Sequence, residues 1–231
     1  MSSKDSWSLY VDTRDRFIEL LRSLEVEQAA TAVPFSPGWT VRDVAAHVCG
    51  LNAEVAAGRR EGLGTDERTA LQVQARAGHS VDEICDEWMS HEVAMKGAID
   101  DDSFFGNRLA GDLIVHLQDI RHTLALSIDT DDEATTDAAH TYVVNVQGRV
   151  RERLGIDFDI ALTDGTSFPP DPATDRSSMS LRTTPYDFLR SVTGRRSRRQ
   201  IEALDWSGDP TRILDEAWSP YGELPADDAE V

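Results

Sequence analysis

Apolar residues in the first two-thirds of this 231-residue chain recur mainly at intervals of three and four positions. That interval is the period of an amphipathic helix. The pattern predicts helices over residues 10–30, 41–57, 66–77, 80–99, 109–126 and 135–154. Because the connections between them are short, neighbouring helices are expected to run antiparallel. The N-terminal part of the chain is therefore predicted to be an up-and-down four-helix bundle.

The pattern changes after Gly155. Apolar and polar residues alternate over 158–163, which is typical of a half-buried strand, and Asp164-Gly165 is a turn sequence leading to a second strand. Residues 169–175 are predicted to be a loop, 179–182 another strand, and 185–194 and 211–217 helices, the first of them capped by Thr184. The expected class is α+β, with a helical bundle at 1–154 and a small α/β domain at 155–231.

Charge and cysteine content restrict the expected partners and compartment. Asp and Glu number 42 against 23 Lys and Arg, a formal charge of −19. Such a chain repels phosphate backbones and anionic lipid, so we expect no nucleic acid and no membrane partner. Two cysteines, Cys49 and Cys85, give neither a disulfide framework nor a thiolate zinc motif. Without a signal-like or spanning apolar run, a cytoplasmic location is expected.

Three residues form a candidate metal site. Asp112 and His116 are four positions apart, so their side chains lie one turn apart on one helix face. His47 lies on an otherwise apolar face of its own helix and is expected to point into the bundle. Two imidazoles and one carboxylate would leave a coordination position open, as catalytic metal sites do.

Each of these signals has a plain structural alternative. A single histidine on an apolar face is often a hydrogen-bonded core residue, and the Asp-x-x-x-His spacing occurs by chance on surface helices. Cys49 lies about 200° around the helix from His47 and is expected to pack as a small apolar residue. From spacing alone, the metal site therefore stays one reading among several.

Two segments resemble the motifs of a known family. Residues 37–48, PGWTVRDVAAHV, are similar to the W-T-x-x-D-x-x-x-H signature of the DinB-like superfamily and its mycothiol-dependent maleylpyruvate isomerase branch. Residues 112–121, DLIVHLQDIR, resemble that branch's second motif, in which an acidic residue, usually Glu, precedes a His by four positions. Residues 185–196 and the stretch Trp206 to Gly208 resemble a small C-terminal domain related to sterol-carrier proteins.

The resemblance implies a site and its cofactors. It assigns His47, Asp112 and His116 as ligands of a divalent metal, zinc first and nickel second, with mycothiol as the thiol cofactor. In this family the thiolate adds to a cis double bond, the former double bond rotates, and elimination leaves the trans isomer. Asp112 stands where Glu is usual, and its shorter side chain puts metal affinity or selectivity in doubt.

Two further residues are predicted to act at the site. Asp119, one turn beyond His116, is placed to accept the free ring N–H of that histidine, or to pair with an arginine, or to be a solvated helix charge. Arg195, in the chain's one cationic cluster, would meet a substrate carboxylate if the second domain folds over the bundle, and is otherwise a solvated helix end. Both are carried as candidate catalytic residues.

The implied function is a metal-dependent enzyme of maleylpyruvate isomerase or thiol S-transferase type, which the ligand set cannot distinguish. Its partners would be a small-molecule substrate and the thiol, in a monomer or homodimer. Two alternatives stay open. One is a non-catalytic bundle that binds a small molecule or a protein at a degenerate metal site. The other is a hydrolase in which the metal activates water.

Overall fold

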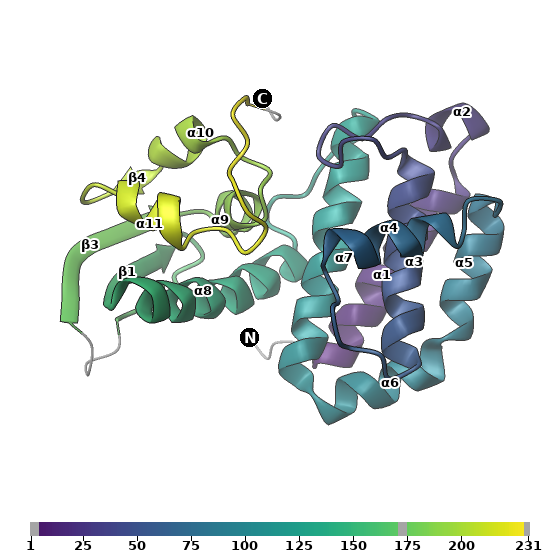
Figure 1. Ribbon diagram of the computed structural model, residues 1–231, viewed down its shortest axis with the longest axis horizontal. Coiled ribbons are helices and arrows are strands. Elements are labelled where there is room, and N and C mark those ends of the chain that lie inside the picture. Colours follow the sequence, from purple (N-terminus) through teal and green to yellow (C-terminus); the bar gives the residue numbers. More distant parts are fainter. Residues whose placement is uncertain (1–4, 171–174, 229–231) are drawn as a thin grey trace. The chain divides into compact units, whose positions relative to one another are not determined.

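The computed structural model describes residues 5–170 and 175–228, in two compact units, Met1–Ile128 and Asp129–Val231. The first unit is helical and the second combines helices with a small sheet (Figure 1), so the predicted α+β class is confirmed. The division falls earlier than the predicted boundary at residue 154. The reason is that helix α8 (Glu133–Leu154) packs against strand β1 (Ile156–Leu162) and helix α9 (Pro185–Val192) of the second unit.

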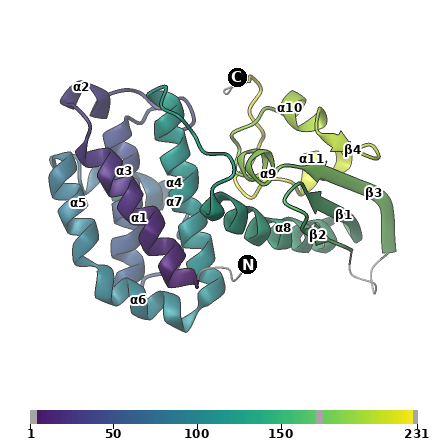
Figure 2. The same cartoon turned by 180° about the vertical axis from the view of Figure 1, so that it is seen from behind.

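Four helices of the first unit lie side by side (Figures 1 and 2). They are α1 (Ser6–Arg22), α3 (Val41–Ala56), α5 (Val81–Ser90) and α7 (Ser103–Thr123). The shorter α2 (Val26–Ala29) follows α1, α4 (Asp66–Gln74) packs on α3, and α6 (Glu92–Asp101) joins α5 to α7. The large side chains buried between α1, α3, α5 and α7 include Tyr10, Phe17, Ile84, Trp88 and Leu113.

Helices α3 and α5 run in the same direction, a departure from the strict alternation of an up-and-down bundle. Arg42, at the start of α3, donates hydrogen bonds to the carbonyl oxygens of Arg76 and His79, just before α5 begins. Arg60, just beyond the end of α3, pairs with Asp102 at the end of α6. The link over residues 57–80, which carries α4, returns the chain to the end where α3 started, and this link is what brings α4 beside α3.

Helix α3 begins where the sequence predicts. The hydroxyl of Thr40 accepts the backbone N–H of Asp43 at 3.2 Å, and the Asp43 carboxylate accepts the backbone N–H of Thr40 at 3.0 Å. This reciprocal capping box satisfies two N–H groups that the first helical turn leaves without partners. The start of the helix is thereby fixed seven residues before His47.

Two predicted helices are each divided in the structure. The helix predicted over 10–30 is α1 followed by α2, which Glu25 and Gln28 start with a capping box of their own. The helix predicted over 80–99 is α5 followed by α6, and the break is at His91. Trp88 and Met95 are buried on the two sides of this break. The apolar spacing therefore continues across the break, and the sequence pattern does not reveal it.

The second unit is built on a four-stranded sheet of order β2-β1-β3-β4. Helix α8 ends at Gly155, whose φ of 67° is the left-handed conformation that glycine adopts without steric cost. The Asp164-Gly165 turn joins β1 to the antiparallel β2 (Ser167–Phe168), as predicted. Strand β3 (Asp175–Thr183) pairs parallel to β1, and β4 (Asp205–Trp206) pairs antiparallel to β3. The predicted loop at 169–175 includes 171–174, which lie outside the described residues.

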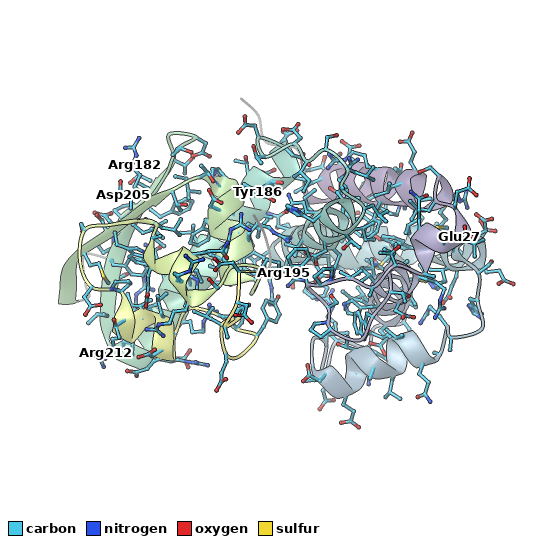
Figure 3. All side chains as sticks on the ribbon, turned by 90° about the horizontal axis from the view of Figure 1, so that it is seen from above. Glu27, Arg182, Tyr186, Arg195, Asp205 and Arg212 are labelled. Carbon is cyan, nitrogen blue, oxygen red and sulfur yellow. The ribbon has the colours of Figure 1, made fainter. Side chains whose placement is uncertain are left out.

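Helices and aromatic side chains complete this unit. Thr184 caps α9 as predicted, and α10 (Arg198–Glu202) and α11 (Thr211–Glu216) follow. The core holds four aromatic rings that contact one another in succession, with centroids 5.5 to 5.9 Å apart: Phe158, Trp206, Trp218 and Phe188. Arg182 and Asp205 mark the paired ends of β3 and β4 (Figure 3). Within the described part of the chain, no helix is both long enough and apolar enough to cross a membrane.

Candidate metal centre

The structure brings His47, Asp112 and His116 together inside the first unit. His47 comes from α3, and Asp112 and His116 come from successive turns of α7. One potential ligand atom from each lies within 4.8 Å of the others. Both histidines are buried, with 7% and 8% of their surface exposed. Their role as metal ligands stays a prediction, and the structure brings the three side chains to one place.

The distance between Asp112 and His116 is compatible with binding to a single first-row ion. The two imidazole rings are 5.2 Å apart between centroids and nearly perpendicular, and Nε2 of His116 is 3.8 Å from Oδ1 of Asp112. Ligand atoms at about 2.1 Å from one zinc ion can be no more than about 4.2 Å apart. The Asp112–His116 pair meets that limit. Asp112 therefore reaches the histidine although its side chain is one methylene shorter than the usual Glu.

An unsatisfied carboxylate oxygen supports a fit to a cation. Within the described residues, Oδ2 of Asp112 is buried and has no hydrogen-bond partner. A buried carboxylate oxygen without a partner costs free energy, and native proteins rarely leave one so. A cation held between this carboxylate and the two imidazoles would remove that cost, and nitrogen and oxygen donors in this combination are those that zinc accepts.

His47 is held by a chain of side chains that the sequence did not reveal. Its Nδ1 is 2.8 Å from Oε1 of Gln72, and Nε2 of Gln72 donates to Glu54 at 2.7 Å. Glu54 in turn forms an ion pair with Arg68 at 2.8 Å. Gln72 is almost fully buried, with 3% of its surface exposed. The sequence gives little sign of this role, because α4 is short and mostly polar and its periodicity does not mark Gln72 as functional.

Gly50 allows α4 to approach α3 closely enough for this contact. A Cβ atom added at Gly50 would lie 2.5 Å from Cβ of Gln72 and 2.8 Å from Nη1 of Arg76. Real Cβ atoms do not approach other atoms so closely, so any larger residue would push α4 away. Arg76 also holds the end of α4, because its guanidinium bonds the carbonyl oxygen of Gln72 and the carboxylate of Glu87.

Asp119 lies behind His116. Its Oδ2 is 3.4 Å from Nδ1 of His116, and the carboxylate is fully buried. This contact is longer than a good hydrogen bond, and a small rotation of the imidazole would close it. The location matches the first of the three roles considered from the sequence. A catalytic part for Asp119 remains a prediction.

Trp39 covers one side of His47. The indole precedes α3 and its ring centroid lies 5.2 Å from that of the imidazole. Trp39 belongs to the motif that resembles the family signature, and the structure gives it a physical role there. It shields one side of the imidazole from water, which strengthens electrostatic interactions at the site.

Arg195 belongs to the second unit. It follows α9, and its guanidinium donates to the carbonyl oxygen of Thr193 in the same segment (Figure 3). The neighbouring Arg196 pairs with Asp187 and lies over the ring of Tyr186. The proposed contact of Arg195 with a substrate carboxylate stays a prediction.

Both cysteines are buried and are not part of the cluster. Burial raises the pKa of Cys49 to about 12 and the pKa of Cys85 to about 11. At neutral pH almost none of either side chain is thiolate, which is the nucleophilic form. The protein's own thiols are therefore poor nucleophiles, and chemistry at sulfur would need a thiol from outside.

The burial and the raised pKa of Cys49 and Cys85 predict that both thiols are alkylated slowly. At pH 8, iodoacetamide should modify neither cysteine of the folded protein in the time that it modifies both in denaturant, as measured by intact mass. Free cysteine at the same concentration is the control for reagent quality. Rapid modification of one thiol in the folded protein would contradict the assigned burial.

A family model matches the N-terminal part of the chain. Residues 11–103 match the family described as the mycothiol maleylpyruvate isomerase N-terminal domain. The match spans less than half of the chain, and it makes the N-terminal part of the chain similar to that family. The match includes His47 and ends at the first residue of α7, so the meeting of Asp112 and His116 with His47 is seen in the structure alone.

Two crystal structures of mycothiol-dependent maleylpyruvate isomerase resemble the chain. One is of a histidine-to-alanine mutant, with a TM-score of 0.58, and for the other the TM-score is 0.51. Each is 13% identical, over 87% of this chain and 91% of the other. At that identity the likeness establishes a shared fold, and it covers both units. No curated protein matches the chain.

Proposed function

We propose that the chain is a metal-dependent enzyme that uses mycothiol, of maleylpyruvate isomerase or thiol S-transferase type. The observation that carries the proposal is the meeting of His47, Asp112 and His116 in a unit that is similar to the isomerase family over residues 11–103. A bound divalent cation would favour the thiolate form of a thiol that coordinates it. Zinc suits two imidazoles and one carboxylate best, with nickel as the second candidate.

The chain's own residues determine the charge of such a site. Two neutral imidazoles and one carboxylate leave a divalent centre with one net positive charge, which favours an anionic sulfur ligand over water. Trp39 and the surrounding buried side chains limit the access of water to His47. Three protein ligands also leave room for a further one, as in catalytic zinc sites.

Turnover with and without the thiol tests the proposal. The zinc-loaded protein, given mycothiol and maleylpyruvate, should produce the trans isomer, and should produce none when either metal or thiol is omitted. If isomerisation is absent, formation of a mycothiol conjugate from an electrophile such as monobromobimane, faster than the uncatalysed reaction without protein, would identify the S-transferase type. Calorimetry that shows no mycothiol binding to the zinc-loaded protein would overturn the proposal, and thiol-independent turnover would favour hydrolysis.

A further inference from the structure

The contacts of His47 extend well beyond the three candidate ligands. His47 contacts Gln72, Gln72 contacts Glu54, and Glu54 is paired with Arg68, all within the first unit. All four residues stand on α3 and α4, which pack against each other, and Glu54 lies in the last turn of α3. The donors and acceptors of these four side chains allow only one arrangement of the hydrogen bonds between them.

The arrangement begins at the charged end. A carboxylate accepts hydrogen bonds and donates none, so Glu54, held by Arg68, must be met by the NH₂ group of Gln72. The carbonyl oxygen of the same amide then has to face His47. The usual ambiguity in the orientation of a glutamine amide is thereby removed by its neighbour.

The amide oxygen in turn decides which nitrogen of His47 carries the proton. An oxygen acceptor 2.8 Å from Nδ1 requires that Nδ1 be protonated. In the neutral imidazole the lone pair then lies on Nε2, which is the form in which a histidine binds a metal through Nε2. His116 is arranged in the same sense, since its Nδ1 faces Asp119 and its Nε2 faces Asp112.

From this geometry we infer that Gln72 is a positioning residue. It fixes His47 in the Nδ1–H tautomer and the orientation that present Nε2 to the metal, and Glu54, held by Arg68, fixes Gln72. The inference rests on the proposed function, because it assigns Gln72 and Glu54 to the metal centre of that enzyme. Hydrogen bonds of this kind to ligating histidines change metal affinity by about 10- to 100-fold.

The first experiment examines the tautomer in the absence of metal. In zinc-free protein with ¹⁵N-labelled histidine, long-range ¹H–¹⁵N correlation should show His47 as the Nδ1–H form, with the signal assigned by its loss in His47→Ala. Gln72→Leu removes the acceptor, and Glu54→Leu frees the amide to turn. Both variants should shift His47 toward the Nε2–H form or a mixture. Gln74→Leu makes the same chemical change on the exposed face of α4 and should leave the tautomer as it is.

The second experiment measures zinc affinity by competition with a chelating dye. The Kd should rise about 10- to 100-fold in Gln72→Leu and stay within about twofold of wild type in Gln74→Leu. An unchanged tautomer and an unchanged Kd in a folded Gln72→Leu protein would overturn the inference while leaving the metal site intact. If the wild-type protein bound no zinc, the proposed function would fail, and the tautomer experiment would still decide whether Gln72 positions His47.

Discussion

Replacing His116 with alanine is expected to raise the Kd for zinc by at least about 100-fold and to abolish thiol-dependent turnover. Structural zinc sites with four protein ligands contribute about 10–16 kcal/mol, or roughly 3 kcal/mol for each ligand, and about 1.4 kcal/mol corresponds to a factor of ten. The same loss is expected for His47→Ala, because the two imidazoles meet at one place. Elemental analysis after dialysis and a chelator competition measure both variants.

The matched control lies on the same helix. His122 is near the end of α7, where its ring contacts Phe35 with centroids 5.7 Å apart, and it is not in the metal cluster. His122→Ala therefore removes an imidazole from α7 without removing a candidate ligand, and should bind zinc as wild type does. Folded His47→Ala and His116→Ala proteins that retained one zinc per chain after dialysis would show that the ligand assignment is wrong.

Gly50→Ala is expected to destabilise the first unit by about 1–2 kcal/mol and to weaken zinc binding as well. The added methyl group would overlap Cβ of Gln72 and the guanidinium of Arg76, and relief requires α4 to move. Overpacking costs about 1–3 kcal/mol, and an overlap with a Cβ atom belongs in the upper part of that range. The roughly 1 kcal/mol that alanine gains over glycine in a helix offsets part of this cost. Movement of α4 also draws Gln72 away from His47, so the two losses should appear together.

Gly97→Ala separates the packing effect from helix propensity. Gly97 is an exposed residue of α6, and a Cβ atom there meets nothing within 4 Å. This variant should be more stable than wild type by about 0.5–1 kcal/mol and should bind zinc normally. Urea denaturation followed by circular dichroism compares the two substitutions. A Gly50→Ala protein with wild-type stability would mean that α4 and α3 are less tightly packed than described.

Much of the fold could be predicted because its boundaries are set by local chemistry. Thr40, Ser80 and Thr184 each start a helix by accepting a backbone N–H three residues later, and such residues are recognisable in a sequence. The break at His91 and the parallel pairing of β1 with β3 depend on contacts between distant segments. The change from helical to strand periodicity predicts a domain boundary at residue 154. Whether α8 packs with the first unit or the second depends on tertiary structure.

The candidate site was predictable to the extent that its residues share a helix or a motif. Asp112 and His116 are one turn apart, and His47 stands in a segment that resembles a family signature. Gln72 could not be found in this way, because it reaches His47 from a different helix, 25 positions along the chain. Its position depends on the close approach at Gly50, and a single glycine in a helix does not say which partner it admits.

The capping box of α3 has one more consequence, which concerns distance along the helix. Thr40 and His47 are seven residues apart, so at about 1.5 Å per residue the imidazole stands about 10 Å, or two turns, beyond the helix start. Inserting one residue between them would rotate the imidazole by about 100° about the axis, away from α7. The number of residues between Thr40 and His47 therefore determines the direction in which the imidazole points. The spacing is as necessary to the candidate site as the two residues themselves.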